Sequence, residues 1–295
     1  MAHPGIDVIR QLLGDTRHDE VPLLERRANL AALAGSPPAP DGVAVEVIEL
    51  AERAAERLTP AGAPGDEVVL YLHGGGYCSG SLDTHRGLAG SLALACGRTV
   101  VALDYRLAPE DPFPAALNDA LLAFDQLAPA RIAIAGDSAG GGLAAATALA
   151  LRDRGGSLPV ALVLISPWVD LTQSAETYAE LGDVDPMLTD RSLTTMAEGY
   201  LAGTDARTPY ASPVFGDLTG LPPTRVDVGS DECLLGDSRT IVDGLVAAGG
   251  TAELHVWPDM IHVFQAFPAE LVPEAAEAVT AAGGFLAGHF APTDG

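Results

Sequence analysis

A serine in the pentapeptide GDSAG has the setting of a catalytic nucleophile. Ser138 lies between the apolar run RIAIA and an alanine-rich stretch typical of a helix. A sharp strand-to-helix turn with small flanking residues would hold its hydroxyl out of the sheet. Serine is also a good helix cap, and Gly140, Gly142 and Ala145 match a dinucleotide-binding pattern. That match lies inside the predicted helix, and no acidic residue ends a following strand, which argues against a dinucleotide site.

A histidine and a carboxylate follow later apolar runs, in the order Ser, Asp, His that such turns use. The histidine would take the serine proton and the carboxylate would orient the histidine. His262, in PDMIHVF after the last run, is the predicted base, since His255 lies within a strand and His289 lies near the chain end. Asp231, directly after RVDVG, is the predicted carboxylate, and the adjacent Glu232 is its one serious alternative.

Three consecutive glycines, Gly74 to Gly76, end the apolar run EVVLYLH. Residues without a Cβ let backbone N–H groups come close to a ligand. Attack on an acyl carbon puts negative charge on an oxygen, and two of these N–H groups with that of Ala139 would stabilise it. A plain glycine turn is the alternative, but it seldom needs three glycines. His73 is interpreted as a brace for this loop.

The composition argues against several classes of protein. A formal net charge of -24 argues against nucleic acid or an anionic membrane as partner. The chain has no lysine, which excludes Schiff-base chemistry, the Walker P-loop and Ser-x-x-Lys enzymes. Its three cysteines lack C-x-x-C spacing and no H-E-x-x-H occurs, so no metal site is expected. Because no leader and no membrane span is recognisable, we expect a cytoplasmic protein.

Apolar runs alternate with helical stretches along the chain, which predicts an α/β fold with a parallel sheet covered on both faces. Strands are expected at 68–73, 99–105, 131–137, 160–166, 225–230 and 252–257. No convincing strand lies between 170 and 216, so an insertion is expected there. We therefore expect a single domain, 1–295, with a cap formed by about 1–42 and 170–215 and a core formed by about 43–169 and 216–295.

Six motifs resemble those of the hormone-sensitive lipase family, the bacterial family IV esterases of the α/β-hydrolase fold. They are HGGGY (73–77), DYRLAPE (104–110), PFPAALND (112–119), GDSAG (136–140), SPWVDL (166–171) and IHVF (261–264). The resemblance implies a mostly parallel eight-stranded sheet with helices on both faces and a helical cap. It also implies hydrolysis of short- to medium-chain carboxylic esters without a cofactor.

The family motifs also assign site residues. Ser138, Asp231 and His262 match the catalytic triad, although many relatives have Asp-Pro where this chain has Asp-Glu. The oxyanion donors of the family match Gly75, Gly76 and Ala139.

The function expected from the motifs is that of a serine carboxylesterase that works through an acyl-enzyme. One alternative is a lactone hydrolase with the same triad, so the expected partner is a small-molecule ester or lactone. A non-catalytic small-ligand receptor on the same fold is a second alternative, against which His262 argues. Dimers are common in the family, and a homodimer is expected by that analogy alone.

Overall fold

Eight strands form one sheet in the order β1-β2-β4-β3-β5-β6-β7-β8. The computed structural model describes residues 4–14, 21–128 and 130–290. Neighbours from β4 across to β8 run parallel, whereas β1 and β2 are antiparallel additions at one edge. The strands are β1 (Val43–Leu50), β2 (Arg53–Pro60), β3 (Glu67–Leu72), β4 (Thr99–Leu103), β5 (Arg131–Asp137), β6 (Leu162–Ile165), β7 (Thr224–Gly229) and β8 (Ala252–Trp257).

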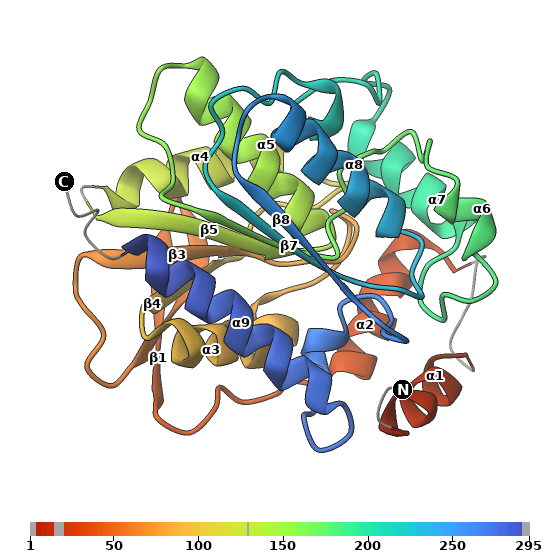
Figure 1. Ribbon diagram of the computed structural model, residues 1–295, viewed down its shortest axis with the longest axis horizontal. Helices are drawn as coiled ribbons and strands as arrows, with labels where there is room; N and C mark the ends of the chain where they lie inside the picture. Colours follow the sequence, from red (N-terminus) through yellow and green to blue (C-terminus); the bar gives the residue numbers. More distant parts are fainter. Residues whose placement is uncertain (1–3, 15–20, 129, 291–295) are drawn as a thin grey trace.

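Helices cover both faces of this sheet, as Figure 1 shows. One face carries α4 (Ala115–Leu127), α5 (Ala139–Asp153) and α8 (Leu235–Ala247), and the other carries α3 (Leu82–Cys96) and α9 (Pro273–Phe290). The apolar strands alternate their side chains between these two layers, so each face has its own buried cluster. The mostly parallel eight-stranded sheet and the helices on both faces confirm the expected fold class.

The remaining helices lie near the N-terminus, between β6 and β7, and in the loop after β8. They are α1 (Gly5–Gly14), α2 (Leu23–Ala34), α6 (Thr177–Glu180), α7 (Asp190–Leu201) and the 3-10 turns η1 (Pro213–Phe215) and η2 (Phe264–Ala266). The segment 166–223 holds α6, α7 and η1 and, being described throughout, contains no strand. Within the described parts of the chain, no helix is long and apolar enough to cross a bilayer.

The hairpin of β1 and β2 is absent from the six runs read as strands. Its turn residues, Ala51 and Glu52, both have positive φ, 56° and 59°, without the glycine or asparagine that usually marks such a turn. Strand β2, RAAERLTP, has residues that favour helices, and most of β1 is exposed. Pairing with β4 therefore overrides local propensity here.

The register of the parallel strands brings the predicted site segments to one edge of the sheet. Leu72 pairs with Gly136, so the glycine loop after β3 runs beside the turn after β5. Asp137 pairs with Ile165, and β7 pairs with β8 up to Gly229 and Trp257. The loops after β3, β5, β6, β7 and β8 consequently meet where the strands end, which is the usual place for a site in an open α/β sheet.

Candidate active site

Ser138 occupies a strained turn between β5 and α5. Its φ of 53° and ψ of -121° are unusual for a residue with a side chain. Glycines at both sides make this geometry feasible, because a Cβ on Gly136 would lie 2.4 Å from the Gly140 carbonyl oxygen, and one on Gly140 would lie 2.0 Å from the Leu72 carbonyl oxygen. The Ser138 side chain makes no capping bond to its helix, so it does not act as a helix cap.

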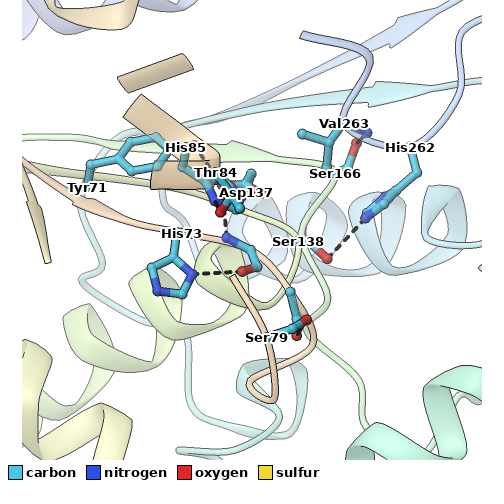
Figure 2. A network of polar contacts seen from close by, with 12 residues as sticks. Tyr71, His73, Ser79, Thr84, His85, Asp137, Ser138, Ser166, His262 and Val263 are labelled. Carbon is cyan, nitrogen blue, oxygen red and sulfur yellow. Dashed lines mark hydrogen bonds and ion pairs between the residues drawn. The ribbon is translucent and has the colours of Figure 1, made fainter. Parts of the chain in front are cut away.

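The hydroxyl of Ser138 faces His262, as predicted from the order of the motifs (Figure 2). Ser138 Oγ lies 3.0 Å from His262 Nε2, and His262 Nδ1 lies 2.7 Å from Glu232 Oε2. All three side chains are buried. With Nδ1–H donating to the carboxylate, Nε2 is free to accept the serine proton, which is the arrangement of a serine nucleophile and its base.

The choice of Asp231 as the partner of His262 is therefore wrong. Its Oδ2 lies 2.6 Å from Arg10 Nη2 of α1, and its Oδ1 accepts the Ser230 hydroxyl at 2.6 Å. Arg10 also donates to the Asp259 carbonyl oxygen. Asp231 thus links α1 to the loop after β7 and lies outside the Ser138–His262 contact.

The turn after β7 explains why the second carboxylate points inward. The backbone N–H of Gly229, the last residue of β7, donates to Glu232 Oε1 at 2.7 Å. This bond folds Glu232 back under the strand end, where it is fully buried, while Asp231 at the tip of the turn stays partly exposed. The two neighbours therefore have opposite orientations.

Ser166, which the sequence did not single out, connects the carboxylate to the histidine loop. Its Oγ donates to Glu232 Oε1 at 2.6 Å and accepts the Val263 N–H at 3.1 Å. Ser166 and Val263 both have positive φ, 44° and 49°. Figure 2 places Ser166 beside Val263 and above the Ser138–His262 pair. In the sequence, only its position directly after β6, in the motif SPWVDL, could have indicated that Ser166 belongs to the site.

Two opposing effects act on the pKa of His262. Burial lowers it, whereas the charge of Glu232 and the hydrogen bond to it raise it, with smaller contributions from Asp185 and Asp137. The net result is a pKa above the ordinary histidine value. Glu232 therefore favours the imidazolium that forms when His262 accepts a proton.

The glycine loop after β3 adopts conformations that side chains would prevent. Gly75 has φ of 116°, and a Cβ on it would lie 2.3 Å from the Ser79 carbonyl oxygen. Gly76 has φ of 62°, and its Cβ would lie 2.2 Å from Met196 Sδ. Among the described residues, neither Gly75 nor Gly76 has a hydrogen-bond partner for its N–H. Ala139 begins α5, where first-turn N–H groups have no partner within the helix.

His73 supports this loop through a hydrogen bond and a stacking contact. Its Nδ1 lies 2.8 Å from the Gly74 carbonyl oxygen, and its ring stacks on Tyr105 at 4.3 Å between centroids. The Tyr105 hydroxyl donates to the His73 carbonyl oxygen at 2.6 Å. Burial, followed by the effect of His85, lowers the pKa of His73 to about 4, so the ring is neutral near pH 7.

Metal ligands do not gather in this part of the fold. Across residues 4–14, 21–128 and 130–290, no three His, Cys, Asp or Glu side chains form a group that could hold a metal ion. The three cysteines are buried thiols that form no disulfide bond with one another.

Comparison with known proteins finds relatives that match most of the chain. A family model described as alpha/beta hydrolase fold matches residues 69–266. An acetyl-hydrolase of Streptomyces hygroscopicus is 41% identical over 298 residues, which cover 97% of this chain and 97% of that protein. A crystal structure of an esterase from the bacterial hormone-sensitive lipase family is similar with a TM-score of 0.94 and 39% identity, covering 99% of this chain and 100% of that chain.

A second solved structure, of EstE5 soaked with p-nitrophenyl butyrate, is similar with a TM-score of 0.92 and 39% identity, covering 98% of this chain and 99% of that chain. These similarities extend over nearly the whole chain, so they concern the helical insertion as well as the sheet. The chain belongs to the α/β-hydrolase family and, within it, to the hormone-sensitive lipase-like esterases.

Proposed function

We propose that this protein is a serine carboxylesterase with Ser138 as nucleophile, His262 as base and Glu232 as the carboxylate that orients the base. The observation that carries the proposal is the continuous contact from Ser138 Oγ through the imidazole to Glu232, at 3.0 Å and 2.7 Å. Relatives named as esterases and an acetyl-hydrolase support the same activity.

In the acylation step, Ser138 Oγ bonds to the ester carbonyl carbon while its proton passes to His262 Nε2. The carbonyl oxygen becomes an oxyanion, which the N–H groups of Gly75, Gly76 and Ala139 stabilise. His262 then gives the proton to the departing alkoxide, and an alcohol leaves.

Deacylation repeats these transfers with water. His262 Nε2 takes a proton from a water molecule as the water oxygen bonds to the acyl carbon, and the proton returns to Ser138 Oγ when the carboxylic acid leaves. Glu232 accepts the Nδ1–H throughout and favours each imidazolium. No step needs a cofactor.

The substrate class follows from the family and from what surrounds the glycine loop. We propose short- to medium-chain esters, with residues 4–14, 21–42 and 170–215 as a cap over the site. Residues 1–3 and 15–20 of the expected cap lie outside the described residues. Met196 of α7 lies against Gly76, and Tyr200 of the same helix stacks on Tyr77 at 3.8 Å between centroids. These contacts bring the insertion to the oxyanion loop and support a compact apolar acyl site. A receptor without catalysis has no evident use for the Ser138–His262 contact.

Replacement of the nucleophile tests the proposal. Ser138→Ala should abolish hydrolysis of p-nitrophenyl butyrate, whereas the exposed control Ser157→Ala should retain it. Full activity in Ser138→Ala would refute the assignment. Rates on ε-lactones and on linear esters of similar size, measured with the native protein, separate the carboxylesterase from the lactone hydrolase.

A further inference from the structure

A second buried polar cluster lies directly behind the nucleophile, on the side away from His262 (Figure 2). Its centre is the carboxylate of Asp137, the residue before Ser138, with a side-chain exposure of 2%. Asp137 Oδ1 accepts the Tyr71 hydroxyl at 2.6 Å and the Gly74 N–H at 3.1 Å. Asp137 Oδ2 lies 3.3 Å from His85 Nε2. The mechanism above uses none of these side chains.

His85 is held toward Asp137 by the beginning of α3. Its Nδ1 lies 2.7 Å from Thr84 Oγ1, and Thr84 is part of the capping box that Ser81 makes at this helix. The side chain of His85 is 12% exposed. Burial lowers the pKa of His85, but the charge of Asp137 and the hydrogen bonds to Asp137 and Ser81 raise it above the ordinary value.

Opposing effects also act on the pKa of Asp137, and their net result favours the charged carboxylate. Burial raises its pKa, but the effects of His85, and then of the Tyr71 hydrogen bond, lower it below the ordinary value. A buried carboxylate that loses a hydrogen-bonding partner is destabilised and tends to take up a proton or admit water. The contact with His85 therefore keeps Asp137 as an acceptor for the Gly74 N–H.

The first glycine of the loop, Gly74, packs directly against this carboxylate. A Cβ on Gly74 would lie 2.1 Å from Asp137 Oδ2, so only glycine lets the carboxylate reach the loop backbone. The hydrogen bond from the Gly74 N–H to Asp137 fixes the peptide between His73 and Gly74. The next peptide, which carries the Gly75 N–H, is held at its Gly74 carbonyl oxygen by His73 Nδ1. The orientation of the Gly75 and Gly76 N–H groups therefore depends on how Asp137 holds the start of the loop.

We propose that His85 is a positioning residue for the oxyanion loop. Its contact with Asp137 holds the carboxylate that fixes the peptide between His73 and Gly74, and through this start of the loop it orients the Gly75 and Gly76 N–H groups. This inference rests on the proposed esterase function, because the oxyanion belongs to that reaction. Removing a single preorganised oxyanion donor typically lowers kcat by about 10²- to 10³-fold. Misorientation of the Gly75 and Gly76 N–H groups, which leaves both donors present, should therefore lower kcat by about 10- to 100-fold.

Steady-state kinetics of His85→Leu on p-nitrophenyl butyrate test this role, with His289→Leu on α9 as the matched control. We expect kcat of His85→Leu to fall about 10- to 100-fold with KM within about threefold, and affinity for a boronic acid that forms a tetrahedral adduct on Ser138 to fall in parallel. His85→Gln, whose amide can still donate to Asp137, should recover part of kcat. Unchanged kcat, or a raised KM alone, in folded His85→Leu would overturn the inference.

A double-mutant cycle asks whether His85 acts through Asp137. If it does, His85→Leu combined with Asp137→Asn should lose no more than about threefold beyond the worse single variant. Independent, multiplicative losses would contradict an action through Asp137. Circular dichroism verifies folding, and His85→Gln serves for the comparison if His85→Leu does not fold.

Amide hydrogen exchange separates this inference from the function on which it rests. The Gly74 N–H should exchange at least about tenfold faster in His85→Leu than in the native protein, with α9 unchanged, whether or not esters are hydrolysed. If the native protein hydrolyses no ester, the proposed function fails and the exchange of Gly74 still decides the role of His85. Unchanged exchange beside an active native enzyme would overturn only the role of His85.

Discussion

Glu232→Gln is the substitution that most sharply tests the assignment of the carboxylate. The side chain keeps its shape, so the change removes the charge and replaces one acceptor oxygen with an NH₂ donor group. The Oε1 position faces two donors, the Gly229 N–H at 2.7 Å and the Ser166 hydroxyl at 2.6 Å. Because the Gly229 N–H cannot rotate, the amide oxygen must take this position and the NH₂ group must face His262.

The new amide then imposes the wrong tautomer on the histidine. Its N–H donates to His262 Nδ1, now an acceptor, so the ring proton moves to Nε2 and faces Ser138. A protonated Nε2 cannot accept the serine proton. A comparable tautomer change in a serine protease triad lowers kcat about 10⁴-fold, and we expect a loss of about 10³- to 10⁴-fold here, equivalent to about 4 to 5.4 kcal/mol of barrier.

The neighbouring carboxylate provides the control. Asp231→Asn keeps an oxygen that can accept from Arg10 and Ser230, and this partly exposed ion pair is worth about 0.2 to 1 kcal/mol. We expect Asp231→Asn to retain kcat within about threefold. Both variants are compared with the native enzyme on p-nitrophenyl butyrate near pH 8. A large loss in Asp231→Asn with nearly full activity in Glu232→Gln would refute the reasoning and restore the choice made from the sequence.

Three further predictions concern the same site. Because Glu232 raises the pKa of His262 and the base must be deprotonated to react, kcat/KM should increase with pH with an inflection above 6.5; a pH profile with its inflection below 6.5 would contradict this. Ser166→Ala removes one hydrogen bond to the carboxylate and should lower kcat about tenfold at pH 8, a result that unchanged steady-state kinetics would exclude. Gly75→Ala places a methyl group against the Ser79 carbonyl oxygen at an unfavourable φ and should lower kcat at least about 100-fold with the fold intact by circular dichroism, whereas native kcat would show that this N–H is not a donor.

The contact between Ser138 and His262 could be predicted because each residue follows a strand with a clear apolar pattern. The parallel register then brings the ends of those strands together, which a topological rule already implies. Ser138 also carries a local signal, the glycines that its turn requires. The fold class was predictable for the same reason, since the sequences of buried parallel strands are continuous apolar runs.

The carboxylate could not be assigned by the same means. Asp231 and Glu232 are adjacent, chemically equivalent and both follow β7, so the choice depends on a turn whose direction is set by the Gly229 N–H and by Ser166 from another loop. Such contacts join residues far apart in the sequence and leave no periodic pattern. The same applies to His85 of helix α3, whose partner Asp137 is the last residue of strand β5.

The most direct test of the account is the site of covalent reaction with an organophosphate such as diethyl p-nitrophenyl phosphate. The native protein, followed by intact-mass spectrometry and peptide mapping, should gain one phosphoryl group on Ser138, with no adduct in Ser138→Ala and a strongly slowed reaction in Glu232→Gln. An active native enzyme that gains no adduct, or gains it on a residue other than Ser138, would contradict the serine mechanism.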